Sequence, residues 1–350
     1  MPTRTSTRPL RIGILGCANI ARQFVRDVSP SRHVKIVAVA SRDATKAAAF
    51  AAHFGIGRTH GSYEGLLADE QVDAIYNPLP NSLHAHWSIE AAKHGKHVLC
   101  EKPLALNRAE AQAMFDAARR HGVMLLEAYP YWFQPQTGDL VKLLHAGAIG
   151  SLRSVQASFG FNLQNASGNI RLNPDLGGGA LLDAGSYPLS LIRLVMGDAP
   201  QRVLAESRPA PSGVDIGTTA TLLWDDGRRA QMACAMDAAM HRRASIVGTA
   251  GAVETEYLNH TAAATSGHPY GYQPSQMRIR RGIAGTVPIE TLRSPVGSGF
   301  RFAADAFARV VATQDQPAID RAAQASLDIA AMLEAIALGA RTGQAVDVTR

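Results

Sequence analysis

Short apolar runs alternate with longer stretches of helical periodicity through the first 130 residues. Buried strands are predicted from the apolar runs at 12–15, 35–41, 74–77, 97–100 and 123–127. Helices are predicted at 19–28, over an alanine-rich segment that stops near Gly55, at 84–93 and at 107–120. This alternation predicts a doubly wound parallel sheet, which binds ligands at the carboxyl edge of its strands.

After about Gly150 strands follow one another with few helices between them. They are predicted at 154–161, 218–224, 229–236 and 244–247, and a helix is predicted to open at the glycine run 177–179. The pattern indicates a second, α+β domain on a mostly antiparallel sheet. We therefore predict an α/β protein with domains at 1–128 and 129–350. Its last helices, at 303–312 and 321–340, are expected to pack back on the body.

Composition narrows the class of protein. Hydrophobic residues make up 46% of the 350 residues and charged residues 18%, a balance that supports buried cores and excludes disorder as a main theme. The most apolar windows, 178–197 and 322–340, contain charged residues, so no membrane partner is expected. The first residues lack the apolar core of a secretory signal, and the three cysteines lie far apart, so we expect a cytoplasmic protein without disulfides.

The net charge of +6 is spread along the chain without a run of five like charges. Arg278, Arg280 and Arg281 lie on a predicted strand and are interpreted as a solvated sheet face. Nucleic acid is therefore not expected as a partner, whereas a phosphate-bearing small molecule fits the surplus.

A glycine turn follows the first predicted strand, in the sequence Gly16-Cys17-Ala18-Asn19-Ile20-Ala21. It has the spacing of the dinucleotide fingerprint with alanine at the second and third glycine positions. Taken alone it could equally be a plain strand-turn-helix. Its place before the first helix of a parallel sheet favours a phosphate site, in which backbone N–H groups of residues 18–20 face the pyrophosphate.

The end of the second strand indicates which nicotinamide cofactor fits. An acidic residue there would hold a free ribose hydroxyl, whereas this chain has Ser41 and Arg42, with Lys46 one turn further on. A hydroxyl and a guanidinium suit a 2′-phosphate, so NADP is favoured over NAD. The alternative is a surface arginine paired with Asp43.

Three further motifs accompany the glycine turn: Glu101-Lys102-Pro103, Asn77-Pro-Leu-Pro-Asn-Ser-Leu-His84 and Gly178-Gly-Ala-Leu-Leu-Asp183-Ala-Gly-Ser-Tyr187. With these four motifs in the family's order, and over residues 11 to about 314, the chain resembles the Gfo/Idh/MocA oxidoreductase family. The resemblance implies an N-terminal Rossmann domain and a C-terminal domain whose open sheet supports a homodimer or homotetramer. It also implies that Lys102 lies beside the nicotinamide and that cofactor contacts come from Pro78, Leu79, Asn81, His84 and Glu101.

Many members of the family end the last motif in a catalytic histidine, whereas this chain has Tyr187. The tyrosine resembles the branch that holds glucose-fructose oxidoreductase, sugar ketoreductases, aldose dehydrogenases and dimeric dihydrodiol dehydrogenases. A free tyrosine, with a pKa of ~10, is too weakly ionised at neutral pH to act as a base, and a nearby ammonium group would favour its phenolate. Lys102 and Tyr187 are therefore predicted to form the proton-transfer pair, with Asp183 fixing Lys102 or a substrate hydroxyl. Alternatively, Tyr187 is a core residue and Asp183 a helix cap.

The substrate is expected to be a sugar or polyol, with a trans-dihydrodiol as the second candidate. Trp132, in an aromatic run that could instead be core, and Arg171, in a loop resembling one that approaches the nicotinamide in this branch, are predicted to contact it. His84 and His86 are two residues apart on a helix and face different sides, so no metal is predicted. A regulatory sensor that binds NADP without turnover and a glycosidase with a tightly held dinucleotide are alternatives of other classes.

Overall fold

The computed structural model describes residues 8–164, 167–263 and 272–349, and it divides the chain into two compact units. The first unit holds residues 1–105, 109–130 and 298–324, and the second holds 106–108, 131–297 and 325–350. The chain thus leaves the first unit near Pro130 and returns to it at Ser298.

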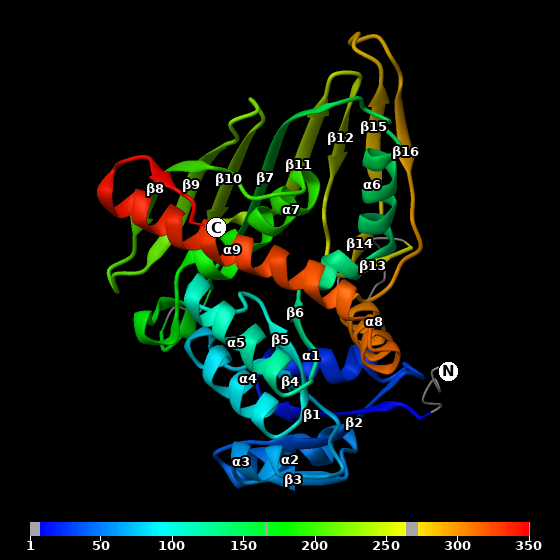
Figure 1. Cartoon of the computed structure of the whole chain (residues 1–350), viewed down its shortest axis with the longest axis vertical. Coiled ribbons are helices and arrows are strands. Elements are labelled where there is room, and N and C mark those ends of the chain that lie inside the picture. Colours follow the sequence, from blue (N-terminus) through cyan, green and yellow to red (C-terminus); the bar gives the residue numbers. More distant parts are fainter. Residues whose placement is uncertain (1–7, 165–166, 264–271, 350) are drawn as a thin grey trace. The chain divides into compact units, whose positions relative to one another are not determined.

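Six parallel strands form the sheet of the first unit, in the order β3-β2-β1-β4-β5-β6 (Figure 1). The sequence order reverses between β1 and β4, which is where sheets of this kind bind their ligands. The predicted doubly wound fold is confirmed. Its strands are β1 (Leu10–Leu15), β2 (Val34–Ala40), β3 (Arg58–His60), β4 (Ala74–Asn77), β5 (His97–Glu101) and β6 (Leu125–Ala128). Its helices are α1 (Asn19–Val28), α2 (Ala44–Phe54), α3 (Tyr63–Leu67), α4 (His84–Lys93), α5 (Arg108–Arg120) and α8 (Gly299–Thr313).

Aromatic stacking joins α1 and α8 to this sheet. Phe24 of α1 lies parallel to the ring of Tyr76 on β4, with centroids 3.8 Å apart, and meets Phe300 of α8 edge-on at 5.7 Å. The hydroxyl of Ser298 donates to Asp27 at 2.8 Å at the edge of the same contact. A helix from late in the sequence therefore completes the core of the first unit.

A nine-stranded sheet dominates the second unit, in the order β16-β15-β12-β11-β7-β10-β9-β8-β17 (Figure 1). Only β7 and β10 pair in parallel among these described neighbours, so the predicted mostly antiparallel sheet is confirmed. Its strands are β7 (Leu152–Asn162), β8 (Arg202–Pro209), β9 (Asp215–Leu223), β10 (Arg229–Ala235), β11 (Asp237–Gly248), β12 (Gly251–Thr255), β15 (Met277–Arg281), β16 (Ile289–Leu292) and β17 (Val346–Asp347). A separate pair is formed by β13 (Thr261–Ala262) and β14 (Gln273–Pro274). The helices are α6 (Pro135–His145), α7 (Ser186–Met196), which packs on β7 and β10, and α9 (Gln316–Thr342), which belongs to this unit from residue 325 onward.

The helix predicted after the glycine run differs from a regular α-helix. It begins with a π-helical turn at Leu181–Gly185, and α7 follows directly. Pro188 explains the change, because it has no N–H to give to the carbonyl of Ala184 and its ring excludes a regular turn there. The turn widens the helix immediately before Tyr187.

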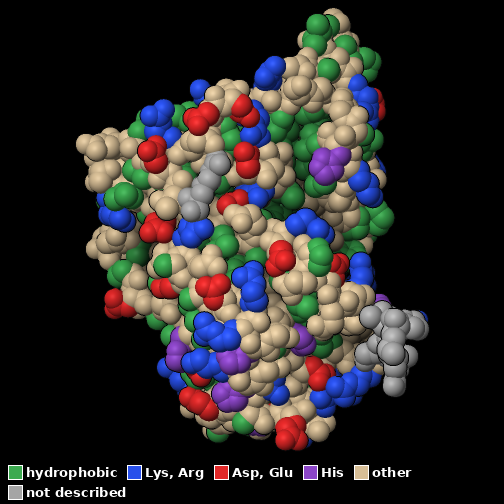
Figure 2. Space-filling view, viewed as in Figure 1, with side chains coloured by type: hydrophobic (Ala, Val, Ile, Leu, Met, Phe, Trp, Pro, Cys, Tyr) green, Lys and Arg blue, Asp and Glu red, His purple; other side chains and the backbone are tan. Residues whose placement is uncertain are grey.

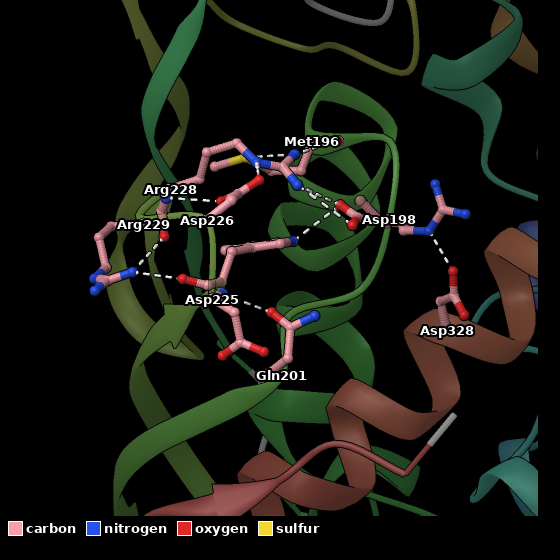
Figure 3. Close-up of polar contacts among 10 residues, drawn as sticks. Met196, Asp198, Gln201, Asp225, Asp226, Arg228, Arg229 and Asp328 are labelled. Carbon is pink, nitrogen blue, oxygen red and sulfur yellow. Dashed lines mark hydrogen bonds and ion pairs between the residues drawn. The ribbon is translucent and has the colours of Figure 1, made fainter.

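An arginine network fixes the carboxyl end of α7 (Figure 3). Arg228, in the turn between β9 and β10, donates to the carbonyl oxygen of Met196 and to the carboxylate of Asp198. The indole N–H of Trp224 donates to the same carboxylate at 2.9 Å, and the guanidinium of Arg228 lies 5.6 Å from the centre of its ring. Because α7 carries Tyr187, this network holds the candidate catalytic helix against the sheet.

The helix α9 is long and apolar enough to cross a bilayer by length and composition, but 67% of its most apolar window is buried inside the protein. Burial of this kind is typical of a core helix. Arg193 of α7 also pairs with Asp328 of α9 in the second unit (Figure 3).

Charges of both signs are interspersed over the face seen in Figure 2. Arg278 pairs with Glu254 at 3.0 Å, and Arg281 pairs with Glu290 at 3.2 Å on the neighbouring strand. Two of the arginines in the basic segment therefore form exposed ion pairs within the sheet, as a solvated sheet face would.

Gly179→Ala is expected to destabilise the protein more than Gly213→Ala. Both glycines have a positive φ, 113° and 91°, but a Cβ atom at position 179 would lie 2.3 Å from Oδ1 of Asp215, whereas one at 213 would meet nothing within 4 Å. We expect a loss of about 1 kcal/mol for Gly213→Ala and of about 3 kcal/mol for Gly179→Ala in urea unfolding. Equal losses would contradict a steric role for Asp215.

Candidate functional site

The turn between β1 and α1 is shaped to receive an anion. Gly16 has a φ of +83°, and a Cβ atom there would lie 3.1 Å from the side chain of Leu79, so the turn and the loop after β4 lie against each other. Helix α1 begins at Asn19, its cap residue is Ala18, and no described side chain caps it or places a negative charge in its first turn. The N–H groups at this helix end can therefore bind a phosphate, as the predicted fingerprint requires.

Basic side chains gather where β2 ends. The carboxylate of Asp43 accepts a hydrogen bond from the backbone of Lys46 at 3.1 Å and lies 3.6 Å from its ammonium group, so Asp43 caps α2. Ser41 accepts from the backbone N–H of Asp43 at 3.1 Å, and Arg42 is exposed. The arrangement leaves a guanidinium at the position where a 2′-phosphate is predicted.

Two residues near the end of β2, Arg22 and Tyr63, were missed by the sequence analysis. Arg22 of α1 lies close enough to Cys17 to act on its charge, although burial is the larger influence and raises the pKa of the thiol. Burial also raises the pKa of Tyr63, with Arg42 opposing it from close by. Neither residue belongs to a short motif, and only folding brings α1 and α3 to the end of β2.

The loop after β4 is supported by a fully buried imidazole. The two ring nitrogens of His84 lie 2.8 Å from the carbonyl oxygens of Leu79 and Pro103. His84 and Asn81 were predicted to contact the cofactor, as were Pro78 and Leu79. In the structure the buried ring of His84 lies between the backbones of Leu79 and Pro103, where it connects the loop after β4 to the loop after β5. Pro78 and Leu79 are buried and Asn81 is half-buried.

Glu101 and Lys102 stand at the carboxyl end of β5. Glu101 is buried and accepts a hydrogen bond of 2.6 Å from the hydroxyl of Tyr76, so its carboxylate supports the strand ends from within the fold. Lys102 is half-buried, and the peptide bond to Pro103 is cis. Lys102 therefore lies at the ligand-binding edge of the parallel sheet, as predicted.

In the second unit, Arg171 and Asp183 are brought together. Nε of Arg171 donates to Oδ2 of Asp183 at 2.6 Å, and its guanidinium lies 5.7 Å from the ring centre of Phe161. Gly178 permits this approach, because a Cβ atom there would lie 2.5 Å from the carbonyl oxygen of Arg171. Two predicted substrate contacts thus form one ion pair between the loop ahead of the glycine run and the π-helical turn.

Tyr187 lies at the start of α7 with its hydroxyl bound by an amide. Nδ2 of Asn259 donates to Oη of Tyr187 at 3.0 Å, and Arg242 holds the other end of the same amide at 2.9 Å. Neither Asn259 nor Arg242 was expected from the sequence, since both lie far from the motifs. Lys102 belongs to the first unit and Tyr187 to the second, and their pairing stays a prediction.

The aromatic residues just before α6 differ in burial. Tyr131 is fully buried, with its hydroxyl 2.7 Å from that of Ser190, whereas Trp132 is half-buried and donates to Tyr131 at 2.6 Å. Gln134 is buried and donates to the carbonyl oxygen of Asn259 at 2.7 Å. Tyr131 is therefore a core residue, and Trp132 remains the candidate for contact with a substrate.

Replacing His84 with glutamine is expected to reduce the loss of stability in acid. Burial lowers the pKa of His84 to about 4, and the charge of Lys102 also opposes its protonation, although the two carbonyls favour it. Between pH ~4 and ~6.5 the unfolded chain binds a proton that the folded chain does not, so stability falls as pH falls through this window. By pH 4 the wild type should lose about 3 kcal/mol more than His84→Gln relative to pH 7, measured by urea unfolding. Identical pH profiles would contradict a neutral buried ring.

Two family profiles match the chain. Residues 10–129 match an oxidoreductase family with an NAD-binding Rossmann fold, and residues 139–254 match the GFO/IDH/MocA C-terminal domain.

Named relatives cover nearly the whole chain. A D-xylose 1-dehydrogenase (NADP(+)) of Haloferax volcanii is 37% identical over 97% of this chain and 100% of its own length. A 3-ketoreductase from Actinomadura kijaniata, solved with NADP and TDP-benzene, has a TM-score of 0.83 and 31% identity over 95% of this chain and 98% of its own. An aldose-aldose oxidoreductase from Caulobacter crescentus has a TM-score of 0.84 and 28% identity, covering 97% and 100%. The NADP named for two of these proteins agrees with the prediction from Ser41 and Arg42. As its motifs predicted, the chain belongs to the Gfo/Idh/MocA family of oxidoreductases.

Proposed function

We propose that this oxidoreductase uses NADP to interconvert a hydroxyl and a carbonyl group of a sugar-like substrate. The observation that carries the proposal is the position of Lys102. It stands at the end of β5, on the same edge of the parallel sheet as the uncapped turn at Gly16. A phosphate site and a positively charged side chain on one sheet edge suit a reaction at the nicotinamide.

Residues of the first unit would hold NADP. Backbone N–H groups of residues 17–20 suit the pyrophosphate, since the end of α1 carries a partial positive charge. Arg42 and Ser41, with Lys46 nearby, suit the 2′-phosphate. Leu79 lies against the Gly16 turn, which would face the pyrophosphate. When bound, NADP supplies the donor or acceptor of the hydride.

The chain's own residues would move the proton. In reduction, the O–H bond of Tyr187 breaks and a new O–H bond forms on the substrate oxygen, and oxidation reverses the transfer. The ammonium group of Lys102 would stabilise the phenolate that remains and orient the substrate oxygen. This division of roles makes Tyr187 the acid and base and Lys102 its electrostatic partner.

A substrate with several hydroxyl groups suits the second unit. Asp183 offers carboxylate oxygens and Arg171 offers N–H donors from one ion pair, and sugars present both acceptors and donors. Trp132, which is half-buried, would give an apolar face to a pyranose ring. Relatives named as dTDP-3,4-didehydro-2,6-dideoxy-alpha-D-glucose 3-reductases support a sugar, and relatives named trans-1,2-dihydrobenzene-1,2-diol dehydrogenases keep a dihydrodiol as the second candidate.

We also propose that the chain forms a homo-oligomer through the open face of its large sheet. A broad hollow of about 1100 Å³ lies on this face in the second unit. Its lining includes Gln156, Ala157, Leu204, Thr219 and Gln231. The resemblance to the family implies that the open sheet supports an oligomer, and this face, where Leu204 is 45% exposed among mostly polar residues, is where another copy would bind.

Reduction of NADP at 340 nm by pentoses, hexoses, inositols and a trans-dihydrodiol tests the reaction. We expect turnover with one class of sugar. Lys102→Ala and Tyr187→Phe should each lower kcat by at least ~100-fold while the Kd of NADPH, measured by fluorescence, changes less than ~3-fold. Wild-type rates in both variants would contradict the proton-transfer pair. Silence of the wild type across the panel and in ketosugar reduction, despite tight NADPH binding, would favour a sensor or a bound-cofactor glycosidase.

Arg42→Ala is expected to weaken the preference for NADP over NAD. Loss of a charge-assisted hydrogen bond to the 2′-phosphate should raise the Kd of NADP by about 10- to 100-fold and leave the Kd of NAD nearly unchanged. Isothermal titration with both dinucleotides measures the ratio, and Arg32→Ala, an exposed arginine before β2, serves as the control. An equal loss for both dinucleotides would place Arg42 elsewhere on the cofactor.

A further inference from the structure

The guanidinium of Arg242 is held between aromatic rings in the second unit. Its Cζ atom lies 4.1 Å from the ring centre of Tyr187 and 4.2 Å from that of Phe159, with Tyr257 at 5.6 Å. All three distances fall within the range in which a cation is attracted to the face of an aromatic ring. The phenol of Tyr187 thus has a permanent positive charge stacked on its ring.

An amide connects the same cation to the hydroxyl of Tyr187. Nη1 of Arg242 donates to Oδ1 of Asn259 at 2.9 Å and to the carbonyl oxygen of Tyr257 at 3.3 Å. Since Arg242 has only donors, it fixes the amide with its oxygen toward the guanidinium and its NH₂ group toward Tyr187. The 3.0 Å contact from Asn259 to Oη of Tyr187 is therefore a hydrogen bond donated to the phenol.

The other tyrosines around Arg242 have different hydrogen-bond partners. Burial raises the pKa of Tyr131 and of Tyr257, and the hydroxyl of Tyr257 donates to the carbonyl oxygen of Ser158 at 2.9 Å. These two phenols keep their protons at neutral pH. Tyr187 receives a hydrogen bond from an amide that is itself bound to a cation, an arrangement that suits a negatively charged oxygen.

Gln134 and Arg242 hold this segment in place from two sides. Gln134 is buried and donates to the backbone of Asn259 and to that of Gly297, at 2.7 and 2.9 Å. The backbone of Asn259 is therefore anchored independently of its side chain. A change at the side chain should alter the hydrogen bond to Tyr187 without releasing the segment.

We propose that Arg242 and Asn259 are positioning residues for Tyr187, which orient its phenol and stabilise its oxygen as the proton leaves. The inference rests on the proposed function, since it takes Tyr187 as the group that gives its proton to the substrate oxygen. Arg242 acts through the ring and through Asn259, and neither residue needs to touch the substrate. Arg242 and Asn259 would thus stabilise the phenolate of Tyr187 from the second unit, the effect proposed above for Lys102 of the first unit.

Arg242→Met and Asn259→Ala test the proposal in the full-length protein with saturating NADPH. We expect kcat to fall about 10- to 100-fold for Arg242→Met and about 10-fold for Asn259→Ala, with KM and the Kd of NADPH within about 3-fold of the wild type. The solvent isotope effect on kcat should rise, because proton transfer becomes slower relative to other steps. Arg242→Lys, which keeps the charge, should recover part of the loss, and Arg208→Met, an exposed arginine of β8, should behave as the wild type.

The decisive measurement repeats both changes in the Tyr187→Phe background. Adding Arg242→Met or Asn259→Ala to Tyr187→Phe should lower the residual rate less than 2-fold, because residues that act through one group are not additive. An unchanged isotope effect, or a full further loss in the Tyr187→Phe background, would overturn the proposal. If Arg242→Met does not fold, Asn259→Ala decides by the same criteria. If Tyr187→Phe itself has the wild-type rate, the proposed function fails at its proton donor, which is a separate result.

Discussion

The carboxyl edge of the parallel sheet depends on one buried imidazole. His84 lies against the backbone of Leu79 on one side and of Pro103 on the other, so the chain segments that follow β4 and β5 share a single support. Loops that carry a site are usually the most mobile part of a fold. A neutral imidazole has one N–H group, so His84 donates to one of these carbonyl oxygens at a time, and packing of the buried ring against both backbone segments holds the two loops together. The placement of Lys102 follows from that constraint.

The two units use opposite means to prepare a polar group for chemistry. In the first, the turn at Gly16 presents backbone N–H groups, and the fold leaves them available by capping α1 with Ala18. In the second, Tyr187 is enclosed by side chains that already satisfy it, among them Asn259 and Arg242. A site for a ligand's phosphates must be left open, whereas a group that changes its charge during reaction benefits from an environment fixed beforehand.

Most elements of the fold could be predicted from periodicity, and the reasons for the failures are physical. Helices at 19–28 and 84–93 and the strand at 74–77 were predicted with the observed bounds, because an apolar face marks each of them. The strand Arg58–His60 and the helix Tyr63–Leu67 were missed because they are too short to show a period. The π-helical turn at Leu181–Gly185 was missed because Pro188 acts on it from four residues downstream.

The candidate site was predictable only where its residues lie in one short motif. Gly16, Lys102, Asp183 and Tyr187 belong to such motifs. The structure places Gly16 and Lys102 at the strand ends expected for them, whereas Asp183 lies in the π-helical turn and Tyr187 in the first turn of α7, not along one regular helix. Arg242 and Asn259 come from a strand and a loop that carry no motif, so only their contacts with Tyr187 in the folded chain reveal them. Glu101 and His84 do belong to motifs, and these motifs indicated a site. They did not indicate that both side chains are buried and bind neighbouring parts of the fold behind it.

The reactivity of two buried thiols can report local opening of the two sheets. Cys100 lies in β5 of the first unit and Cys234 in β10 of the second, and burial raises the pKa of both. A thiol reacts with alkylating agents as the thiolate and only when exposed, so neither cysteine is reactive in the closed fold. The rate at which each is alkylated measures how often its own sheet opens, so the two rates compare local opening in the two sheets without an introduced cysteine.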